Sequence, residues 1–305
     1  MNTTNPNPTA IKAIAIGAGA QNALNRMMAD ALCGVEFIAL DTDPQALDLS
    51  KAAIRACIGQ GATQGNPSAG ERAAEASANV IQRLLGGAEI VFVVAALGGG
   101  TGSGAAPVVA RIANSLGALT IGVVTLPFSF EGTPRNRNAE QALERLRGQV
   151  DALIVIGNDR LLARVDKHAS LRDSFHVADE VMAQAAQGLS DLVARPVLVN
   201  LDVADLRMLF RDSGEVMMVV TTANGENRAR AVAEQAVSSL SKTLDGAEGV
   251  VFNITGGEDM SLFEVSEIAN LIRAAAHPDC RVIFGATMDE KMKDEIRVSL
   301  YATGM

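Results

Sequence analysis

The densest group of residues suited to chemistry is Gly-Gly-Gly-Thr-Gly-Ser-Gly, at positions 98–104. An apolar run typical of a buried parallel strand precedes it, and a helical run with Pro107 near its start follows. On such a turn, backbone N–H groups and the helix dipole favour an anion. Side chains larger than hydrogen would block the approach of a phosphate to the backbone. Thr101 and Ser103 add hydroxyl donors. The segment therefore predicts a phosphate cradle, and the alternative is a glycine-rich turn kept only for tight packing.

This segment differs from the common phosphate loops. A Walker loop ends in Gly-Lys-Ser or Gly-Lys-Thr, and residues 98–104 contain no lysine. A dinucleotide fingerprint opens the first βα unit, whereas this segment lies far beyond the first predicted strand. In this context the segment resembles the signature of the tubulin/FtsZ superfamily of GTPases.

A second loop, Gly17-Ala18-Gly19-Ala20-Gln21-Asn22, also follows a predicted strand and opens a helix. Alone it is a weak signal, but it resembles the first phosphate loop of FtsZ. The resemblance implies that Asn22 and Arg26 lie near the guanine and the ribose. FtsZ has consecutive glycines where this chain has Ala18, Ala20 and Gln21. Since alanine keeps the backbone donors but is strained at positive φ, we expect this loop to hold diphosphate less closely.

Two further loops depart from the family pattern. Asp41 stands where the family usually has asparagine, and a carboxylate there would repel phosphate unless Mg²⁺ or a hydrogen bond offsets it. The loop at residues 59–67, which in the family closes over the γ-phosphate, is shorter by a few residues. Both departures fall on the part of the family site that distinguishes GTP from GDP.

The segment at residues 127–135 runs from a strand end into a helix. By itself, Glu131 is explained by compensation of the helix dipole, and Arg135 by an ion pair with Glu131. The resemblance instead implies that Glu131 contacts the ribose hydroxyls and that Arg135 lies near ribose and phosphate. It also implies that Asn158, after the next strand, contacts the nucleoside.

Asp179 is the predicted reader of the base. Guanine offers N1–H and N2–H₂ donors, which a carboxylate can accept together. The resemblance assigns this role to Asp179, with its neighbour Glu180 as the less favoured candidate. The plain alternative is two solvated acids on a helix face. His176 is interpreted as incidental.

Two carboxylates three residues apart, Asp202 and Asp205, share one face of a nascent helix. By themselves they indicate no more than a helix cap and a solvated turn. Together with Asn200 they resemble the synergy loop of the family, Asn-x-Asp-x-x-Asp. The resemblance implies that this loop acts on the nucleotide of the next subunit in a head-to-tail stack, where a carboxylate orients or deprotonates the attacking water.

The predicted strands and helices indicate how the fold brings these residues together. Strands are predicted at residues 11–16, 35–40, 89–95, 118–125 and 152–156, with helices between them at 22–32, 44–54, 69–85, 104–116 and 134–149. This alternation predicts a doubly wound parallel α/β sheet with ligands at the carboxyl ends of its strands. A long helix at about 175–193 follows, and a mixed α+β domain comes after it.

In that last part, strands are predicted at 215–222, 249–254, 281–286 and 296–302, with helices at 227–240 and 262–276. Only a turn at 288–294 separates the last two strands, so that pair can be antiparallel. The predicted organisation is a leader at 1–10, a GTP-binding domain at 11–174, a connecting helix at 175–196 and a smaller α+β domain at 197–305.

Composition limits the classes of function. The 305-residue chain is long enough for two ordinary domains, and its formal net charge of −9 argues against a general binder of nucleic acid or anionic membranes. Three scattered cysteines without metal-site spacing favour reduced thiols in the cytoplasm. The sequence shows neither a signal peptide nor an apolar stretch long enough to span a bilayer.

Taken together, the sequence predicts an FtsZ-like GTPase that forms protofilaments with copies of itself and hydrolyses GTP at the subunit junction. The resemblance covers about residues 11–304. It implies GTP/GDP as ligand and Mg²⁺ held mainly by phosphates and water, with no side chain assigned as a metal ligand. The predicted catalytic residues are Asn200, Asp202 and Asp205. The predicted nucleotide-binding residues are Gly17, Ala18, Gly19, Ala20, Gln21, Asn22, Arg26, Gly98, Gly99, Gly100, Thr101, Gly102, Ser103, Gly104, Glu131, Arg135, Asn158 and Asp179.

Two alternatives stay open. The first is a nucleotide-binding filament subunit with little turnover that assembles alone or with a full-length FtsZ. The altered loops, and the lack of the family's C-terminal linker and tether-binding peptide, favour a divergent tail-less bacterial paralogue in division or a related positioning role. The second is a doubly wound dehydrogenase, disfavoured because the first loop is not Gly-x-Gly-x-x-Gly. Retention of NAD by the purified protein would favour it.

Overall fold

The structure is a computed structural model that describes residues 10–29, 34–161, 170–194 and 201–304. The chain divides within one long helix, α8 (Leu171–Ala194), into a compact unit that ends at Ala186 and another that begins at Gln187. This division falls inside the predicted connecting helix. The predicted domain limits themselves stay predictions.

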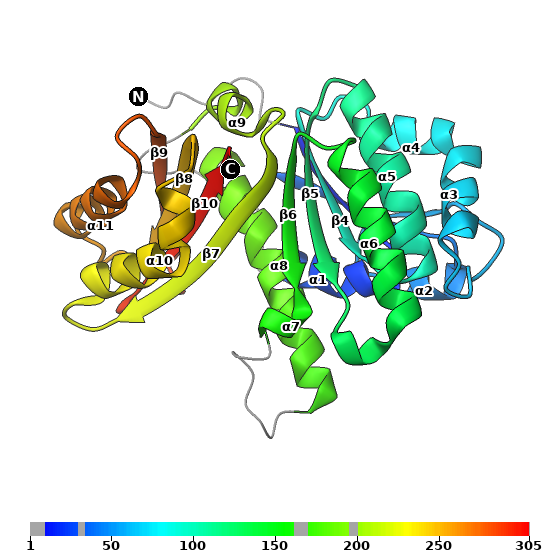
Figure 1. Ribbon diagram of the computed structural model, residues 1–305, viewed down its shortest axis with the longest axis horizontal. Helices are drawn as coiled ribbons and strands as arrows, with labels where there is room; N and C mark the ends of the chain where they lie inside the picture. Colours follow the sequence, from blue (N-terminus) through cyan, green and yellow to red (C-terminus); the bar gives the residue numbers. More distant parts are fainter. Residues whose placement is uncertain (1–9, 30–33, 162–169, 195–200, 305) are drawn as a thin grey trace. The chain divides into compact units, whose positions relative to one another are not determined.

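The first unit is built on a parallel six-stranded sheet in the order β3-β2-β1-β4-β5-β6. Strands β4, β5 and β6 of this sheet lie side by side in Figure 1. Its strands are β1 (Ile11–Ile16), β2 (Val35–Asp41), β3 (Ile54–Cys57), β4 (Ile90–Ala96), β5 (Leu119–Leu126) and β6 (Ala152–Gly157). Most strand residues are apolar and buried, as expected when helices cover both faces of a parallel sheet. The predicted doubly wound parallel fold is confirmed.

The helices of this unit form two layers. They are α1 (Ala18–Ala29), α2 (Pro44–Asp48), α3 (Pro67–Ala76), α4 (Ala78–Leu85), α5 (Gly100–Ser115), α6 (Thr133–Arg147) and α7 (Asn158–Leu161). Helices α3 to α6 pack beside one another and form a core with alternate strand residues such as Ile14 and Ile16. Helix α1 packs on β1, β2 and β4. Because successive side chains of a strand point to opposite faces of the sheet, alternate strand residues face the two helix layers.

Four predicted helices differ from the structure in their extent. The helix predicted at 44–54 is wrong in its second half, because α2 ends at Asp48 and residues 54–57 form the edge strand β3. The helix predicted at 69–85 is interrupted at Ser77, whose backbone is not helical and whose hydroxyl donates to the carbonyl of Ile58 at 3.3 Å. Helices α1 and α5 begin four residues earlier than predicted, so Gly19 lies in the first turn of α1, and Gly100 and Gly102 lie in the first turn of α5.

The second unit contains a mixed sheet in the order β7-β10-β8-β9. Its strands are β7 (Gly214–Asn224), β8 (Gly249–Gly256), β9 (Arg281–Met288) and β10 (Glu295–Thr303). Strand β10 runs antiparallel to β7 and β8, whereas β8 and β9 are parallel. The predicted mixed α+β domain is confirmed, but the last two strands of the chain do not pair. Strand β10 lies inside the sheet because its residues are buried on both faces, whereas β9 is partly exposed and forms the edge.

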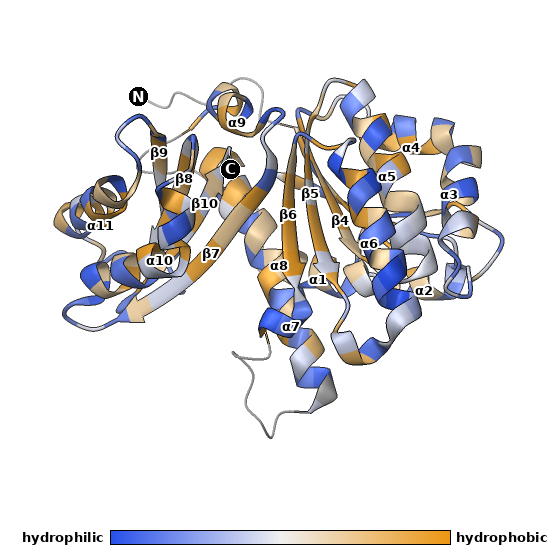
Figure 2. Ribbon diagram, viewed as in Figure 1, coloured by the Kyte–Doolittle hydropathy of each residue, from blue (hydrophilic) through white to orange (hydrophobic). Residues whose placement is uncertain are grey.

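Three helices accompany this sheet: α9 (Val203–Phe210), α10 (Arg228–Leu244) and α11 (Leu262–Ala275). Helices α10 and α11 cover one face and share an apolar core with β8 and β10. Figure 2 shows the same division in hydropathy, with mainly apolar strands and helices that carry one polar side. Within the described residues, no helix is long and apolar enough to cross a membrane.

Candidate functional site

The functional geometry of the first unit is concentrated at the carboxyl edge of its sheet. The strand order reverses between β1 and β4, since the chain leaves β1 toward β2 and leaves β4 toward β5 on the other side. Open α/β sheets bind ligands at such a point. A pocket of about 360 Å³ opens there. Its lining is Ile16, Gly17, Ala18, Gly19, Asp41, Thr42, Asp43, Ala46, Ala62, Thr63, Gln64, Gly65, Ala96, Gly99, Gly100, Thr101, Gly102 and Arg135.

Two helices begin at this pocket. Ala18 is the first residue of α1 and Gly100 the first of α5, and both line the pocket. The first N–H groups of a helix have no partner inside the helix, and its dipole favours an anion at that end. Gly17 and Gly98 precede these helices with φ of +81° and +103°, a conformation that glycine adopts without strain. The two predicted loops thus line one concavity, where two helix N-termini favour an anion.

Several glycines of the 98–104 segment are required by close packing. A Cβ on Gly100 would collide with Thr63, and one on Gly104 with the carbonyl oxygen of Pro67 at the start of α3. A Cβ on Gly102 would collide with the carbonyl oxygen of Ala96. Around Gly99, in contrast, a Cβ would meet no atom within 4 Å. The packing explanation therefore accounts for three glycines, and it operates alongside the anion-binding geometry.

Ser103 stabilises the loop through a buried hydrogen bond. Its hydroxyl oxygen accepts the backbone N–H of Gly98 at 2.7 Å, the side chain is buried, and it does not line the pocket. Ala20, Gln21 and Gly104 are also buried outside the pocket lining.

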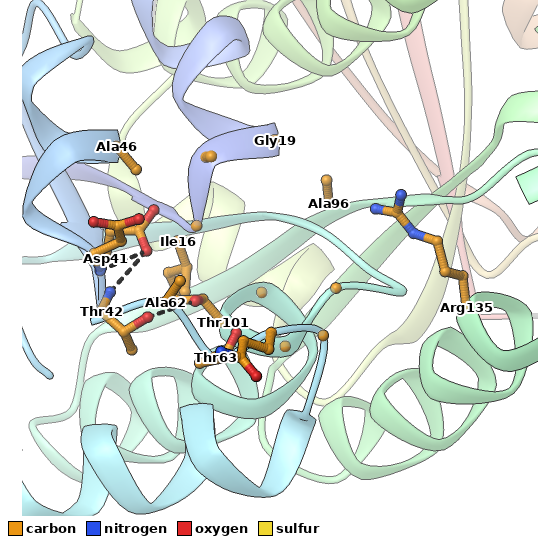
Figure 3. A pocket seen from close by; sticks show the side chains of 18 residues that line it. Ile16, Gly19, Asp41, Thr42, Ala46, Ala62, Thr63, Ala96, Thr101 and Arg135 are labelled. Carbon is orange, nitrogen blue, oxygen red and sulfur yellow. Dashed lines mark hydrogen bonds between the residues drawn. The ribbon is translucent and has the colours of Figure 1, made fainter. Parts of the chain in front are cut away.

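A network of hydrogen bonds holds the Asp41 carboxylate in the pocket wall (Figure 3). Its Oδ1 accepts the backbone N–H of Thr42 at 2.7 Å and of Asp43 at 3.2 Å, and its Oδ2 accepts from Nε2 of Gln21 at 3.1 Å. Burial raises the pKa of Asp41, and the hydrogen bonds oppose this shift. The hydroxyls of Thr42 and Thr101 lie 2.9 Å apart beside it. The hydrogen bonds therefore hold the carboxylate in place and offset part of the cost of burying its charge.

The loop at residues 59–67, predicted to be short for the family, forms another part of the pocket wall. Gly61 donates its N–H to the carbonyl of Thr42 at 3.0 Å, and the side chain of Asn138 donates to the carbonyl of Gly65 at 3.2 Å. Thr63 and Gln64 line the pocket between these contacts. The loop is thus attached to β2 on one side and to α6 on the other.

Arg135 and Glu131 form the ion pair expected from their spacing, with Nη1 and Oε2 3.1 Å apart. Glu131 also accepts the backbone N–H of Phe128 at 2.8 Å, which closes the turn before α6. Only Arg135 of the two lines the pocket. Asn158 is buried at the start of α7, and its Oδ1 has no partner within the part of the chain that the structure describes.

Asp179 is a buried carboxylate beside α1. It is 7% exposed, and burial raises its pKa to about 6 although the charge of Arg26 opposes the shift. Arg26 also approaches His176, with Nη2 and Nδ1 3.4 Å apart. His176, predicted to be incidental, thus contacts a predicted ligand of the nucleotide, and its role stays a prediction. Asn22 lies one turn before Arg26 on α1 and is exposed.

In the second unit, Asp202 and Asp205 cap α9 reciprocally. Oδ1 of Asp202 accepts the N–H of Asp205 at 2.8 Å, and Oδ2 of Asp205 accepts the N–H of Asp202 at 3.2 Å. This capping box fixes the two carboxylates on one turn. Asn200 lies outside the described residues.

Sequence reasoning did not assign Thr42, Asp43, Thr63 or Gln64 to the site, although all four line the pocket. A general signal exists for the first two, because they follow β2 at the same edge of the sheet as the glycine loops. Thr63 and Gln64 follow β3, a strand that the sequence did not predict.

Comparison with known proteins identifies relatives of this chain. The description "Tubulin/FtsZ family, GTPase domain" matches residues 10–166, and "FtsZ family, C-terminal domain" matches residues 214–305. The chain belongs to the tubulin/FtsZ family. An FtsZ dimer from M. jannaschii, described as empty, is 36% identical and covers 98% of this chain and 89% of its own, with a TM-score of 0.93.

Two more distant solved structures share the fold. CetZ2 from Haloferax volcanii, described as a GTPγS-bound protofilament, is 19% identical and covers 96% of this chain and 92% of its own, with a TM-score of 0.77. CetZ1 from the same organism, described as a GDP-bound monomer, is 18% identical and also has a TM-score of 0.77. It covers 97% of this chain and 94% of its own. The pocket thus lies in the GTPase domain of an FtsZ-like fold.

Proposed function

We propose that this protein binds GTP and GDP in the pocket of its first unit and polymerises head to tail, with GTP hydrolysed between adjacent subunits. The observation that carries the proposal is the convergence of the α1 and α5 N-termini on one pocket of a tubulin/FtsZ GTPase domain. The backbone N–H groups around Gly17 and residues 99–102 bind the phosphates.

The nucleoside contacts follow from the polar residues beyond the phosphate pocket. Asp179 accepts the N1–H and N2–H₂ donors of guanine, which adenine lacks in that arrangement. Asn22 and Arg26 lie near base and ribose, Glu131 and Asn158 bind the nucleoside, and Arg135 contacts ribose and phosphate. Burial of Asp179 supports this role, because a carboxylate with few partners gains most from a ligand with two donors.

Hydrolysis requires a group that positions the attacking water. We assign it to Asp202 and Asp205 of the neighbouring subunit, together with Asn200. In the capping box, Oδ2 of Asp202 and Oδ1 of Asp205 make no bond within the described residues, so each can accept a proton from water. The carboxylates and the pocket belong to different units of the chain, which is compatible with a site completed by a second copy.

Mg²⁺ is the expected cofactor. The oxygen groups of the pocket wall suit this ion, which prefers hard oxygen ligands and is commonly held by one or two carboxylates plus substrate phosphates. Within the described residues, no group of three or more histidine, cysteine or acidic side chains could hold a metal by itself. The ion would add positive charge beside the phosphates and stabilise the charge that develops during transfer.

Self-association is the proposed mode of action in the cytoplasm, in cell division or a related positioning role. The similar structures described as an FtsZ dimer and a CetZ2 protofilament support this proposal. Ala18, Ala20 and Asp41 depart from the family pattern. These departures favour a second candidate function, a filament subunit with little turnover that co-assembles with a full-length FtsZ.

Asp205→Asn tests the proposed catalysis. The amide keeps an acceptor for the N–H of Asp202 and so preserves the capping box, but it removes the charge. We expect unchanged GTP affinity and turnover lowered by about 10²–10⁴-fold. Asp245→Asn, at an exposed acid at the end of α10, is the matched control and should change neither quantity. Turnover of Asp205→Asn equal to that of wild type would contradict the assignment. It would favour the low-turnover filament only if wild-type turnover is also slow.

A further inference from the structure

The pocket has an unusual balance of charge for a site that holds phosphates. Three of its lining residues are charged at neutral pH, namely Asp41, Asp43 and Arg135. Two of these carry the same sign as the ligand. A nucleoside di- or triphosphate brings additional negative charge at every phosphate.

Arg135 does not offset the acids. It lies on the opposite side of the pocket from Asp41 (Figure 3), its side chain is half exposed, and it pairs with Glu131 at 3.1 Å. The helix N-termini supply only partial charges, each equivalent to about half an elementary charge. The described pocket therefore lacks a full positive charge near Asp41.

Asp41 cannot easily turn away from a ligand. Its side chain is buried, and bonds from the N–H groups of Thr42 and Asp43 and from Gln21 fix both carboxylate oxygens. Each oxygen retains a further lone pair, since a carboxylate has about four acceptor sites. The hydroxyls of Thr42 and Thr101 add oxygen atoms within the same part of the wall.

We propose that Asp41 makes nucleotide binding in this protein depend on a divalent cation, which its carboxylate helps to hold against the phosphates. The inference rests on the proposed nucleotide function and adds a protein ligand to a cation otherwise assigned to phosphates and water. The carboxylate and hydroxyl oxygens are the ligand types that Mg²⁺ prefers, with substrate phosphates completing its coordination. Without the cation, Asp41 repels the ligand that the helix N-termini attract.

Asp41→Asn separates charge from shape. The amide oxygen can still accept the N–H groups of Thr42 and Asp43. The new NH₂ group would face Nε2 of Gln21, but Gln21 can rotate its amide. Its Oε1 is buried without a partner in the described structure and can accept that NH₂ group. Asp48→Asn is the matched control, because Asp48 is an exposed acid of α2 outside the pocket lining.

The experiment measures the affinity of wild type, Asp41→Asn and Asp48→Asn for fluorescent GDP, with Mg²⁺ and with EDTA, at constant ionic strength. We expect removal of Mg²⁺ to weaken binding by about 10²-fold in wild type and Asp48→Asn, the scale of one like-charge contact in a partly buried site. In Asp41→Asn we expect a change of about threefold or less. Thermal unfolding of each variant verifies that it is folded.

Equal affinity of the wild type with Mg²⁺ and with EDTA would overturn the inference while leaving the proposed nucleotide binding intact. A folded Asp41→Asn variant with the full wild-type Mg²⁺ dependence would overturn it as well. If no form of the protein binds guanine nucleotide in either buffer, the proposed function itself fails. The three results are distinct in the same data set.

Discussion

At the scale of single residues, the nucleotide site depends on polar groups held in buried positions. Asp179 illustrates this, because it is a carboxylate removed from water beside one opposing charge, Arg26. A buried carboxylate without enough donors is costly in the free protein, and a ligand that brings two N–H donors relieves that cost. In the proposed role of Asp179, the same burial disfavours the empty site and favours guanine.

The first prediction concerns this preference. Asp179→Asn should weaken GTP binding by roughly 1.5–3 kcal/mol and reduce discrimination against ATP, because it removes a charge-assisted pair of hydrogen bonds. Competition between GTP and ATP measures both effects. Glu180→Gln, at the exposed neighbour, is the control. Loss of selectivity in that variant alone would move the base reader to Glu180.

A second prediction concerns pH. Burial raises the pKa of Asp179 from 3.8 to about 6 in the folded protein, so the folded state holds this proton more tightly than the unfolded state. The stabilisation from this proton is complete below about pH 4 and is lost as the pH rises through about 6. At about pH 7.5, Asp179→Asn should therefore stabilise the nucleotide-free protein by roughly 1–3 kcal/mol.

Chemical unfolding of the nucleotide-free protein between about pH 4.5 and 7.5 checks this prediction. The stability of Asp179→Asn relative to wild type should rise across that range, whereas Glu180→Gln should follow wild type. A constant difference between Asp179→Asn and wild type would mean that the carboxylate does not change its protonation there.

Part of the site could be predicted at this scale, and part could not. The glycine segment at 98–104 indicates anion binding through local chemistry alone, and family resemblance pointed to Asp179. The hydrogen bond from Gln21 to Asp41, and the contact between Arg26 and His176, join residues distant in the sequence. No local pattern encodes such contacts, because they arise when α1 packs beside β2 and α8.

At the scale of elements, the close packing of α5 against α3 shapes the phosphate loop. Gly100 and Gly104 allow the backbones of residues 63–67 to approach the start of α5. This approach brings Thr63 into the pocket wall beside Thr101. Glycines predicted for ligand access thus also determine how two helices meet.

Gly104→Ala and Gly99→Ala should separate the two roles. At Gly104 the added methyl group collides with the carbonyl oxygen of Pro67, so we expect a destabilisation of about 1–3 kcal/mol despite the better helix propensity of alanine. At Gly99 the space is open, and stability should change by less than about 0.5 kcal/mol. Denaturant unfolding of both variants tests this. Equal free energies of unfolding for the two variants would show that α3 shifts to accommodate the added methyl group at little cost.

The elements also show where sequence patterns reach their limit. Strands β1, β2, β4, β5 and β6 could be predicted because each is an apolar run bounded by turn residues. Strand β3 has four residues that alternate between partly buried and exposed, too few to establish a period. The insertion of β10 between β7 and β8 depends on which strand buries both faces, a property that chain order does not reveal.

At the scale of the whole molecule, the proposed active site requires two copies of the chain. The pocket residues belong to the unit that ends at Ala186, and Asp202 and Asp205 belong to the other unit. GTP turnover per subunit should therefore be near zero in dilute protein and rise as filaments form. Turnover and light scattering across a concentration series measure this. Constant turnover per subunit would indicate a self-contained site.

The most direct test of the shared site mixes two inactive variants. Asp205→Asn keeps the pocket but lacks the catalytic carboxylate. Gly99→Glu places a carboxylate in open space at the α5 N-cap, where it should exclude phosphate without harming the helix, and it keeps Asp202 and Asp205. GTP turnover is measured for each variant and for their equimolar mixture. The account predicts inactive variants and a mixture with a substantial fraction of wild-type turnover, because some junctions pair an intact pocket with an intact Asp205. Two folded, co-assembling variants whose mixture remains inactive would contradict it.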